Sequence, residues 1–400
     1  MCPAAAGDGP LPDNARRQAG PAAGRGVVSV TRTEQPYDVA AYVWPAYSDD
    51  QRARIFFPER IGEWERVRQS QPKFPGHQQP RRPLWGYQNE ADPRVMAMQI
   101  DAAADHGVNV FIYDWYWYDR RPFLEGCLND GFLQAANHER MRFYLMWANH
   151  DATTGWDLRN SDDPSNVVWN GFVDRAEFEV IGRRVIERYL CHPAYYTLGG
   201  RPVFSIYDLA NLVKGFGGVA ETRQGLDWFR REAERAGLPG LHLQAVLWSR
   251  LMLNLSGVDG PPLDHQGEVV QQLGFDSATN YQWCHLANVN RPCLEVLADA
   301  VKWWKQAAAE YPIPFFPHVS IGWDSNARTV ALRPNIMTAN EPDKFAAGLR
   351  EARAYLDARP ELPRLVTINS WNEWTESSYL LPDTDHGMGY LEAVREVFGS

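Results

Sequence analysis

The amino-acid sequence predicts a (β/α)8 barrel, and three observations support this prediction. Eight short apolar segments alternate with eight segments of helical character, as in a barrel of parallel strands. The predicted strands repeatedly end in Trp, Asp, Asn or His, and such barrels gather their active sites at the carboxyl ends of the strands. The chain has 400 residues, of which 44% are hydrophobic, so it can build one large core.

The N-terminal segment, residues 1–35, is predicted to be a disordered tail, and residues 36–400 are predicted to form the barrel. The tail is rich in Ala, Gly, Pro and Arg, a composition that buries too little apolar surface to fold. It has no apolar stretch typical of a signal peptide, so we expect a cytoplasmic protein unless another export route is used. We expect deletion of the tail to leave the melting temperature and the activity unchanged.

Each predicted strand is a short apolar run, and a segment with helical spacing separates it from the next. The expected strands are residues 38–44, 108–113, 142–147, 202–207, 241–248, 277–281, 313–321 and 365–370. The expected helices are residues 92–106, 126–139, 175–190, 222–236, 267–272, 294–310, 343–357 and 390–398. Residues 45–89 form an unusually long loop between the first strand and the first helix.

The helix expected at residues 92–106 has clear signals at both ends. Asp92 is suited to the N-cap position, and Pro93 is suited to the first helical position. Gly107 stands directly after the last expected helical residue, where a left-handed conformation commonly ends a helix.

The composition restricts the partners that the protein can have. The formal net charge is −10 and the isoelectric point about 5.5, which argues against nucleic acid or an anionic membrane. No apolar run approaches the roughly 18 residues of a membrane span. The five cysteines, Cys2, Cys127, Cys191, Cys284 and Cys293, lack C-x-x-C spacing, and we predict free thiols. We expect no metal and no cofactor, and the oligomeric state is left open.

Aromatic residues in polar surroundings indicate a carbohydrate substrate. The chain has 16 Trp, 17 Tyr and 17 Phe, many of them in stretches such as DWYWYD, LMWANHD and SWNEWTE. Sugars stack their C–H faces on aromatic rings, while their hydroxyls need hydrogen-bond partners. We therefore predict an oligosaccharide or polysaccharide substrate. The predicted substrate-binding residues are Trp44, His77, Asp114, Trp115, Tyr116, Trp117, Trp147, Asn149, Tyr207, Trp248, Tyr281, Trp323, Asp324, Asn372 and Trp374.

Trp115 and Trp117 carry a more specific prediction. They lie two residues apart after a predicted strand, so in an extended segment they share one face. We expect at least one of them to stack on the substrate, so that a Trp→Ala change raises KM and leaves the fold intact.

Glu373 and Glu376 are the candidate catalytic residues. They follow the apolar run 365–368, and packing does not call for two carboxylates at the mouth of a buried strand. An E-x-x-E pair usually belongs to a solvated helix face, but Trp371 and Trp374 surround this one. We expect a strand-to-turn transition to bring both carboxylates into one cleft, as in a glycosidase. Burial and a neighbouring like charge would raise the pKa that a general acid needs.

Two weaker signals occur elsewhere in the sequence. Asp383-Thr384-Asp385 has the D-x-D pattern of metal-dependent and nucleotide-sugar-dependent transferases, but a turn-capping role is more common. His77, His150 and His318 lie in or near strand-end loops, where a lone histidine is usually structural. Among them we favour His77 for the site, because residues 74–76 precede it in a tight loop.

Seven short motifs occur in a fixed order, and the resemblance that they carry covers roughly residues 37–398. They are FPGHQQP at 74–80, DWYW at 114–117, LMWAN at 145–149, HPAYY at 192–196, GRPVF at 200–204, GWD at 322–324 and INSWNEWTE at 368–376. Together they resemble glycoside hydrolase family 99, the endo-α-mannosidases, and more closely the bacterial WbsX-like relatives of that family.

This resemblance implies a (β/α)8 barrel and a retaining mechanism without an enzyme nucleophile. One Glu deprotonates the 2-hydroxyl of the sugar, which attacks the anomeric carbon to form a 1,2-anhydro sugar. The other protonates the leaving oxygen and then activates water. By position, Glu373 is the base and Glu376 the acid/base. Thr375 stands where the endo-α-mannosidases have His, and Ser377 where Gly is usual, differences that concern the substrate more than the reaction.

We therefore predict a glycoside hydrolase that cleaves an α-linked, manno-configured or related bond with retention. One alternative is a glycosyltransferase in polysaccharide biosynthesis, which would need a nucleotide-sugar donor. The eight alternations do not indicate a nucleotide-sugar fold. The other alternative is a non-catalytic carbohydrate-binding barrel, and the presence of both Glu373 and Glu376 argues against it.

Overall fold

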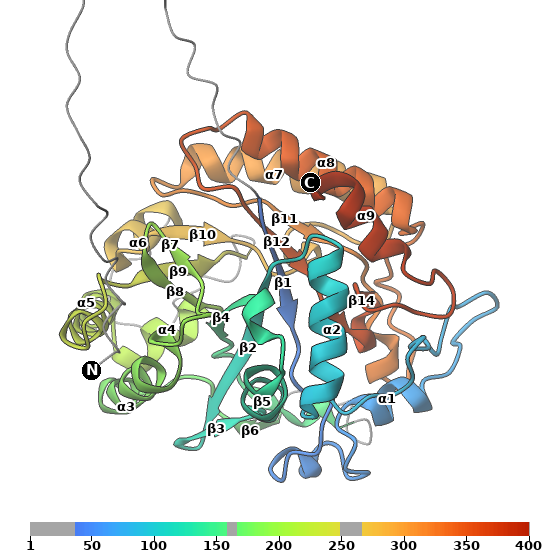
Figure 1. Ribbon diagram of the computed structural model, residues 1–400, viewed down its shortest axis with the longest axis horizontal. Helices are drawn as coiled ribbons and strands as arrows, with labels where there is room; N and C mark the ends of the chain where they lie inside the picture. Colours follow the sequence, from blue (N-terminus) through green and yellow to red (C-terminus); the bar gives the residue numbers. More distant parts are fainter. Residues whose placement is uncertain (1–36, 158–165, 249–265, 400) are drawn as a thin grey trace, which may run out of the picture.

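The protein is a barrel of eight parallel strands surrounded by helices (Figure 1). The computed structural model describes residues 37–157, 166–248 and 266–399, so the predicted tail, residues 1–35, lies outside the described residues. The barrel strands are β1 (Asp38–Val43), β2 (Val110–Tyr118), β4 (Arg142–Trp147), β8 (Arg201–Ile206), β9 (His242–Val246), β10 (Ser277–Thr279), β11 (His318–Ser320) and β12 (Leu365–Asn369).

The barrel closes between β10 and β11, the two strands at the ends of the sheet order. The strands pair in the order β10-β9-β8-β4-β2-β1-β12-β11. A parallel bridge between Ala278 and Phe315 joins the two ends, since Ala278 donates to the carbonyl of Pro314 and accepts from Phe316. Most residues of the strands are fully buried, as expected when the barrel interior and the helices cover both faces. The predicted (β/α)8 barrel is confirmed.

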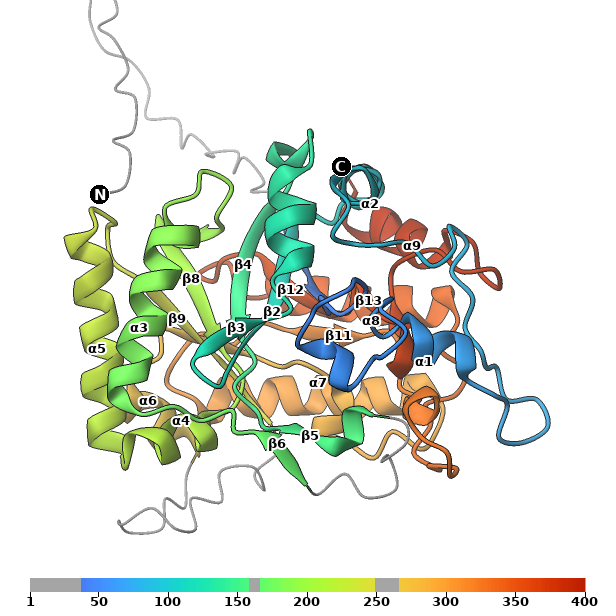
Figure 2. The ribbon, with the colours of Figure 1, turned by 90° about the horizontal axis from the view of Figure 1, so that it is seen from below.

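The outer layer contains helices that follow the strands along the chain. They are α2 (Pro93–Asp105), α3 (Arg175–Val185), α4 (Leu209–Phe216), α5 (Val219–Arg235), α6 (Gln266–Leu273), α7 (Cys293–Glu310), α8 (Pro342–Asp357) and α9 (Gly389–Phe398). Figures 1 and 2 both show α3 and α5 on one side of the barrel and α2 and α9 on the other.

The end signals predicted for α2 are confirmed. The Asp92 side chain accepts a hydrogen bond of 2.9 Å from the backbone N–H of Arg94, and Pro93 occupies the first helical position. Gly107 has a φ of +89°, in the left-handed region that lets glycine end a helix.

One predicted helix is broken up in the structure, and one predicted strand is shortened. The helix expected at residues 126–139 is instead three short helical turns, Cys127–Gly131, Phe132–Gln134 and His138–Arg140. A Cβ atom on Gly131 would lie 2.1 Å from the carbonyl oxygen of Glu90. The backbone of this segment therefore packs directly against the backbone at Glu90, which leaves no room for the side chains of a regular helix. β11 is shorter than the expected range 313–321, because Pro314 and Pro317 have no N–H for a strand ladder.

β2 is longer than the predicted strand at 108–113. It continues to Tyr118 because β4 pairs with it as far as Trp115 and the short strand β3 (Arg121–Phe123) pairs with its end. Side chains alternate along a strand, so Asp114 and Tyr116 lie on one face of β2, and Trp115 and Trp117 lie on the other. This alternation decides which of the four side chains reaches the candidate site.

Several short elements in the connections were not predicted. They are α1 (Trp64–Gln69), α4, β3, β5 (Ala152–Thr153), β6 (Val167–Trp169), β7 (Thr197–Leu198), β13 (Asn372–Glu373) and β14 (Ser378–Tyr379). Among the described residues, no helix is both long and apolar enough to cross a bilayer.

The prediction of free thiols is confirmed for three cysteines and wrong for one. Cys127, Cys284 and Cys293 are free. Cys191 is disulfide-bonded. No other cysteine lies near it in the sequence, so cysteine spacing could not predict this bond. Cys2 lies outside the described residues.

Candidate active site

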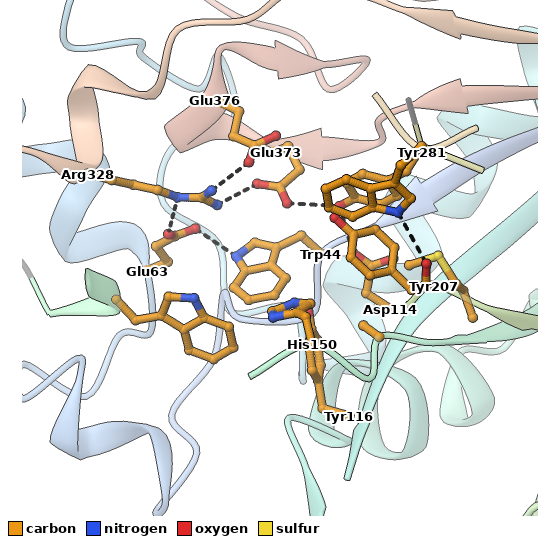
Figure 3. A pocket seen from close by; sticks show the side chains of 14 residues that line it. Trp44, Glu63, Asp114, Tyr116, His150, Tyr207, Tyr281, Arg328, Glu373 and Glu376 are labelled. Carbon is orange, nitrogen blue, oxygen red and sulfur yellow. Dashed lines mark hydrogen bonds and ion pairs between the residues drawn. The ribbon is translucent and has the colours of Figure 1, made fainter. Parts of the chain in front are cut away.

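A cavity of about 320 Å³ opens at the carboxyl ends of the barrel strands (Figure 3). Its lining residues come from the ends of the strands and from the loops that follow them. They are Trp44, Glu63, Asp114, Tyr116, Met146, Ala148, His150, Trp156, Tyr207, Trp248, Tyr281, Arg328, Glu373 and Glu376. This is the end of a (β/α)8 barrel at which active sites form.

A tight hairpin after β12 places Glu373 and Glu376 in this cavity. β13 pairs with β14 in antiparallel fashion, and a single helical turn, Trp374–Glu376, connects them. The backbone N–H of Glu373 donates a 2.8 Å hydrogen bond to the hydroxyl of Ser370, which fixes the start of the hairpin. The expected strand-to-turn transition is present, and it brings both carboxylates to one wall of the cavity.

Both carboxylates bind the same guanidinium, that of Arg328. Nη1 of Arg328 lies 2.6 Å from Oε1 of Glu376, and Nη2 lies 2.9 Å from Oε2 of Glu373. The Nε of Arg328 lies 3.1 Å from Oε1 of Glu63, so one cation faces three carboxylates (Figure 3). The Arg328 side chain is 28% exposed at the cavity, whereas the three glutamate side chains are buried.

Burial and mutual repulsion raise the pKa of the two candidate catalytic carboxyls. The pKa of Glu373 is raised well above its usual value, mainly by burial and then by the charge of Glu376, against the opposing effect of Arg328. Burial also raises the pKa of Glu376, and the charge and hydrogen bond of Arg328 lower it. Two such groups beside one cation titrate together, so the pair can retain a proton near neutral pH.

Asp114 and Tyr281 extend the polar part of the cavity. The Tyr281 hydroxyl lies 2.8 Å from Oδ2 of Asp114 and 3.2 Å from Oε1 of Glu373, and its single hydrogen can be donated to one of them at a time. Burial raises the pKa of Asp114 well above its usual value, and the hydrogen bond from Tyr281 opposes that effect.

Two carboxylate oxygens in the cavity have no hydrogen-bond partner among the described residues. They are Oδ1 of Asp114 and Oε2 of Glu376, and both are buried. Buried acceptors are normally paired, so both oxygens are suited to accept hydrogen bonds from a ligand. Hydroxyl groups are the simplest ligand donors for such a pair.

Aromatic rings form the remaining walls. Trp44 meets Tyr116 edge-on at 5.5 Å and Trp156 at 5.7 Å between ring centroids. The indole N–H of Trp44 donates a 2.7 Å hydrogen bond to Oε2 of Glu63, which holds this ring beside the carboxylates. Tyr207 and Trp248 contact each other edge-on at 4.8 Å. Such a combination of rings and carboxylates fits a sugar.

The structure places eight of the predicted site residues in the cavity. They are Trp44, Asp114, Tyr116, Tyr207, Trp248, Tyr281, Glu373 and Glu376.

Trp115, Trp117 and Trp147 are three of the nine predicted site residues that do not line this cavity. The prediction that these three line the site is wrong, because β2 and β4 keep alternating and turn the indoles outward. The indole N–H of Trp115 donates to Glu125, and that of Trp117 donates to Glu177 on α3.

The remaining predicted residues support the cavity or line another one. The Asn149 amide binds the backbone N–H and carbonyl of Asp208, and the Asn372 amide binds those of Trp44. Trp374 stacks on Tyr379 at 3.9 Å. The other three residues, His77, Trp323 and Asp324, line a second cavity.

Six lining residues lie outside the predicted set: Glu63, Met146, Ala148, His150, Trp156 and Arg328. Glu63 and Arg328 lie in long connections with no periodic pattern and are 265 residues apart in the chain. A usable signal existed for Arg328, because two buried carboxylates call for a nearby cation. His150, for which a structural role is the expectation, lines the cavity, and burial lowers its pKa.

The D-x-D segment is a capped turn, as expected. Oδ1 of Asp383 accepts from the backbone N–H of Asp385 and of His386, and Oδ2 accepts from the hydroxyl of Tyr379. Among residues 37–157, 166–248 and 266–399, no cluster of three or more His, Cys, Asp or Glu side chains is arranged to hold a metal ion.

Solved structures share this barrel. The structure of the GH99 endo-α-mannosidase from Bacteroides thetaiotaomicron matches with a TM-score of 0.56 and 13% identity, over 90% of this chain and 95% of that one. A structure described as a glycoside hydrolase-like protein matches with a TM-score of 0.60 and 13% identity, over 92% of this chain and 95% of that one. At such identities the likeness shows the fold.

Sequence comparison gives the family. The uncharacterized protein WxcX of Xanthomonas campestris pv. campestris is 26% identical over 379 residues, which cover 90% of this chain and 49% of that protein. The chain thus spans about half the length of the curated relatives it matches. The family model described as glycosyltransferase WbsX matches residues 39–394, nearly the whole described barrel. The chain therefore belongs to the WbsX family.

Proposed function

We propose that the protein is a retaining glycoside hydrolase that cleaves an α-linked, manno-configured or related glycosidic bond. The observation that carries this proposal is the pair of buried carboxylates, Glu373 and Glu376, bound to one guanidinium in an aromatic-walled cavity. Two carboxyl groups flanking a glycosidic bond are the usual machinery of a glycosidase. The barrel shared with a solved GH99 endo-α-mannosidase supports the same reaction class.

In the proposed reaction the substrate supplies its own nucleophile. Glu373 takes the proton of the 2-hydroxyl while that oxygen attacks the anomeric carbon. Glu376 gives its proton to the leaving oxygen as the glycosidic bond breaks. In the second step, Glu376 takes a proton from water, which opens the 1,2-anhydro ring, and Glu373 returns its proton to the sugar oxygen. The anomeric carbon inverts twice, so its configuration is retained.

The contacts of Glu376 support its role as the acid. Oε2 of Glu376 is buried and unpaired, so it is available to a leaving oxygen, while Oε1 stays bound to Arg328. A raised pKa keeps a general acid protonated near neutral pH, and burial raises the pKa of both Glu376 and Glu373. The free Oδ1 of Asp114 is suited to a neighbouring sugar hydroxyl.

Glycosyl transfer is the second candidate, because the family model carries the description of a glycosyltransferase. That reaction would take the sugar from a nucleotide-linked donor. The D-x-D segment is poorly suited to bind a nucleotide-sugar donor, since both oxygens of Asp383 already accept hydrogen bonds, from the backbone N–H groups of Asp385 and His386 and from the Tyr379 hydroxyl. A non-catalytic carbohydrate-binding barrel is the third candidate.

A screen of α-linked manno-oligosaccharides, followed by ¹H NMR, distinguishes these candidates. We expect hydrolysis without any nucleotide and in the presence of EDTA, with the α-anomer as the first product. The Glu376→Gln variant is the matched inactive control. Transfer from a nucleotide-sugar donor without hydrolysis would favour the transferase, and binding without turnover would favour the non-catalytic barrel. A 2-deoxy substrate should not turn over, and rapid turnover of it would contradict the proposed participation of the 2-hydroxyl.

A further inference from the structure

A second cavity, of about 230 Å³, lies next to the first and is built partly from the same two segments. The connection between β11 and α8 supplies Arg328 to the first cavity and Trp323 to the second. The hairpin after β12 supplies Glu376 to the first cavity and the next residue, Ser377, to the second. Consecutive Cα atoms are about 3.8 Å apart, so the two cavities come within one residue of each other at this point.

The second cavity contains a buried guanidinium whose hydrogen-bonding capacity is unfilled. Arg81 lines the cavity and is 8% exposed. Its Nε is buried and has no hydrogen-bond partner among the described residues. Its ion pair with Asp385 has an Nη1 to Oδ2 distance of 3.6 Å, too long for a good hydrogen bond. A guanidinium has five N–H donors, and burying them unpaired costs free energy, so this arrangement calls for acceptor oxygens from a ligand.

The other walls favour hydroxyl oxygens over an anion. Glu341 lines the same cavity and Asp385 pairs with Arg81, so an added negative charge would meet two carboxylates. The Ser377 hydroxyl accepts a 3.1 Å hydrogen bond from Gln79, which leaves its own hydrogen free to donate. A hydroxyl group of a ligand can accept from Arg81 or Ser377 and can donate to Glu341.

Trp323 adds an aromatic wall to this set of donors and acceptors. It is half-buried and lines the cavity, so part of its indole remains accessible. An aromatic ring beside forked polar groups is the combination that recognises a sugar ring. The cavity is smaller than the roughly 300–1,000 Å³ of sites for drug-sized ligands, so it fits one sugar residue rather than a chain.

We propose that this second cavity is a sugar subsite, in which Arg81 and Trp323 bind the residue adjoining the scissile bond of an oligosaccharide. The proposal rests on the proposed hydrolysis, because the first cavity then holds the bond that is cleaved. His77 and Asp324 form the wall rather than the contacts. Nε2 of His77 and Oδ2 of Asp324 lie 2.8 Å apart and satisfy each other, and Nδ1 of His77 accepts from the backbone of Lys73.

The kinetic test compares a long and a short substrate. An aryl α-mannoside needs only the first cavity, whereas an α-linked mannotetraose reaches both. For Arg81→Gln we expect the ratio of kcat/KM for mannotetraose to that for the aryl mannoside to fall roughly tenfold to a hundredfold, the worth of a hydrogen bond to a charged group. Arg82→Gln is the matched control, because Arg82 is the exposed neighbour of Arg81, and it should leave the ratio unchanged.

A second variant covers the case in which Arg81→Gln does not fold. Trp323→Leu should lower the same ratio, and Trp323→Phe, which keeps an aromatic ring, should restore most of it. An unchanged ratio, or an equal loss on both substrates, in the folded variants would overturn the subsite.

A binding measurement separates this proposal from the proposed hydrolysis. Calorimetric titration of mannotetraose into Glu376→Gln protein, with and without Arg81→Gln, requires no turnover. A weaker affinity in the double variant supports the subsite even if the wild-type protein hydrolyses neither substrate. Absence of hydrolysis would contradict the proposed function and leave the subsite supported. Equal affinities would overturn the subsite even if hydrolysis is observed.

Discussion

Two clusters built on buried glutamates meet at the end of strand β12, one with three glutamates and one with a single glutamate, and they differ in the charge of the partner groups. The front cluster is Glu63, Glu373 and Glu376 around Arg328, and it faces the first cavity. The back cluster is Glu90 with Gln99, Cys127 and Asn372, and Glu90 is fully buried. The two clusters are joined because Asn372 and Glu373 are consecutive residues.

The back cluster contains only neutral donors. Nδ2 of Asn372 donates to Glu90 at 2.8 Å and Nε2 of Gln99 donates at 3.2 Å, and no cation contacts this carboxyl group among the described residues. Burial raises the pKa of Glu90 to about 8, and the hydrogen bonds from Gln99, Asn372 and Cys127 only partly oppose it. Burial alone therefore produces a carboxyl group that is mostly neutral at pH 7. The difference between the clusters is the cation, because Arg328 lowers the pKa of both Glu373 and Glu376, whereas only neutral hydrogen-bond donors lower that of Glu90.

The largest effect is expected for the two glutamates that face the cavity. Glu373→Gln should lower kcat roughly 10²–10⁴-fold on every substrate, because the base is needed whatever the leaving group is. Glu376→Gln should lower kcat as strongly for poor leaving groups, but much less for an activated aryl glycoside, whose departure needs little protonation. Steady-state kinetics on both substrate types checks this. Equal losses on both for Glu376→Gln would show that it is not the general acid.

A smaller effect is expected when the cation of the front cluster is removed. Arg328 lowers the pKa of Glu373 and of Glu376, so in Arg328→Met both pKa values rise. The base then ionises at higher pH, and the acidic limb of the kcat/KM profile should move to higher pH. Below that limb, activity should fall about tenfold per unit of the shift. Arg328→Lys keeps the positive charge, so its acidic limb should lie close to that of the wild type. An acidic limb at the wild-type pH in Arg328→Met would contradict the assigned role of the cation.

A still smaller effect on activity is expected in the back cluster, together with a change in stability. Because the pKa of Glu90 in the folded protein is about 8 and its ordinary value is 4.5, the folded state holds a proton that the unfolded state releases between these values. The stability contribution of this group is fully present below pH 4.5 and falls by about 1.4 kcal/mol per pH unit up to pH 8.

The Glu90→Gln variant tests this linkage. It should flatten the dependence of the free energy of unfolding on pH between about 5 and 8. Its kcat should change only a few-fold, because Glu90 acts on the cavity through Asn372 and Trp44. Denaturant titrations at several pH values measure the slope. A slope equal to that of the wild type would show that Glu90 is ionised in the folded protein.

The smallest effect on activity is expected for a residue buried equally deeply but outside both clusters. Trp115 faces away from the cavity, and its indole donates to Glu125. Trp115→Ala should lower the free energy of unfolding by about 3–5 kcal/mol and leave KM unchanged at a temperature where the variant is folded. Thermal unfolding and steady-state kinetics together check this. A raised KM would show that Trp115 contacts the substrate, as the sequence predicts.

Strand β2 shows what the sequence can and cannot predict about this site. The composition of Asp114-Trp115-Tyr116-Trp117 correctly marks a strand end near the site. Alternation then requires that Asp114 and Tyr116 share one face and the two tryptophans the other. In a barrel both faces are buried, so hydrophobicity does not reveal which face points inward. The error at Trp115 and Trp117 follows from this symmetry and not from the fold prediction.

The loops limited the prediction in a different way. The strand ends, including Glu373 and Glu376, were predictable because the local sequence alone places them at the barrel mouth. Glu63 and Arg328 come together only through tertiary structure, from connections that carry no periodic pattern. Arg81 is similar, because its sequence surroundings give no sign that it is buried.

The long connection of residues 45–89 is fastened to the β11–α8 connection at three places. Glu63 holds Arg328, His77 and Gln79 bind Asp324, and the ammonium of Lys73 binds the carbonyl oxygens of Thr329 and Val330 at 2.7 and 2.6 Å.

Two loops joined in this way form one continuous wall of the cavity. Glu63 is therefore a counter-charge that reaches Arg328 from outside the hairpin of Glu373 and Glu376, so a substitution of either hairpin glutamate still leaves the guanidinium paired.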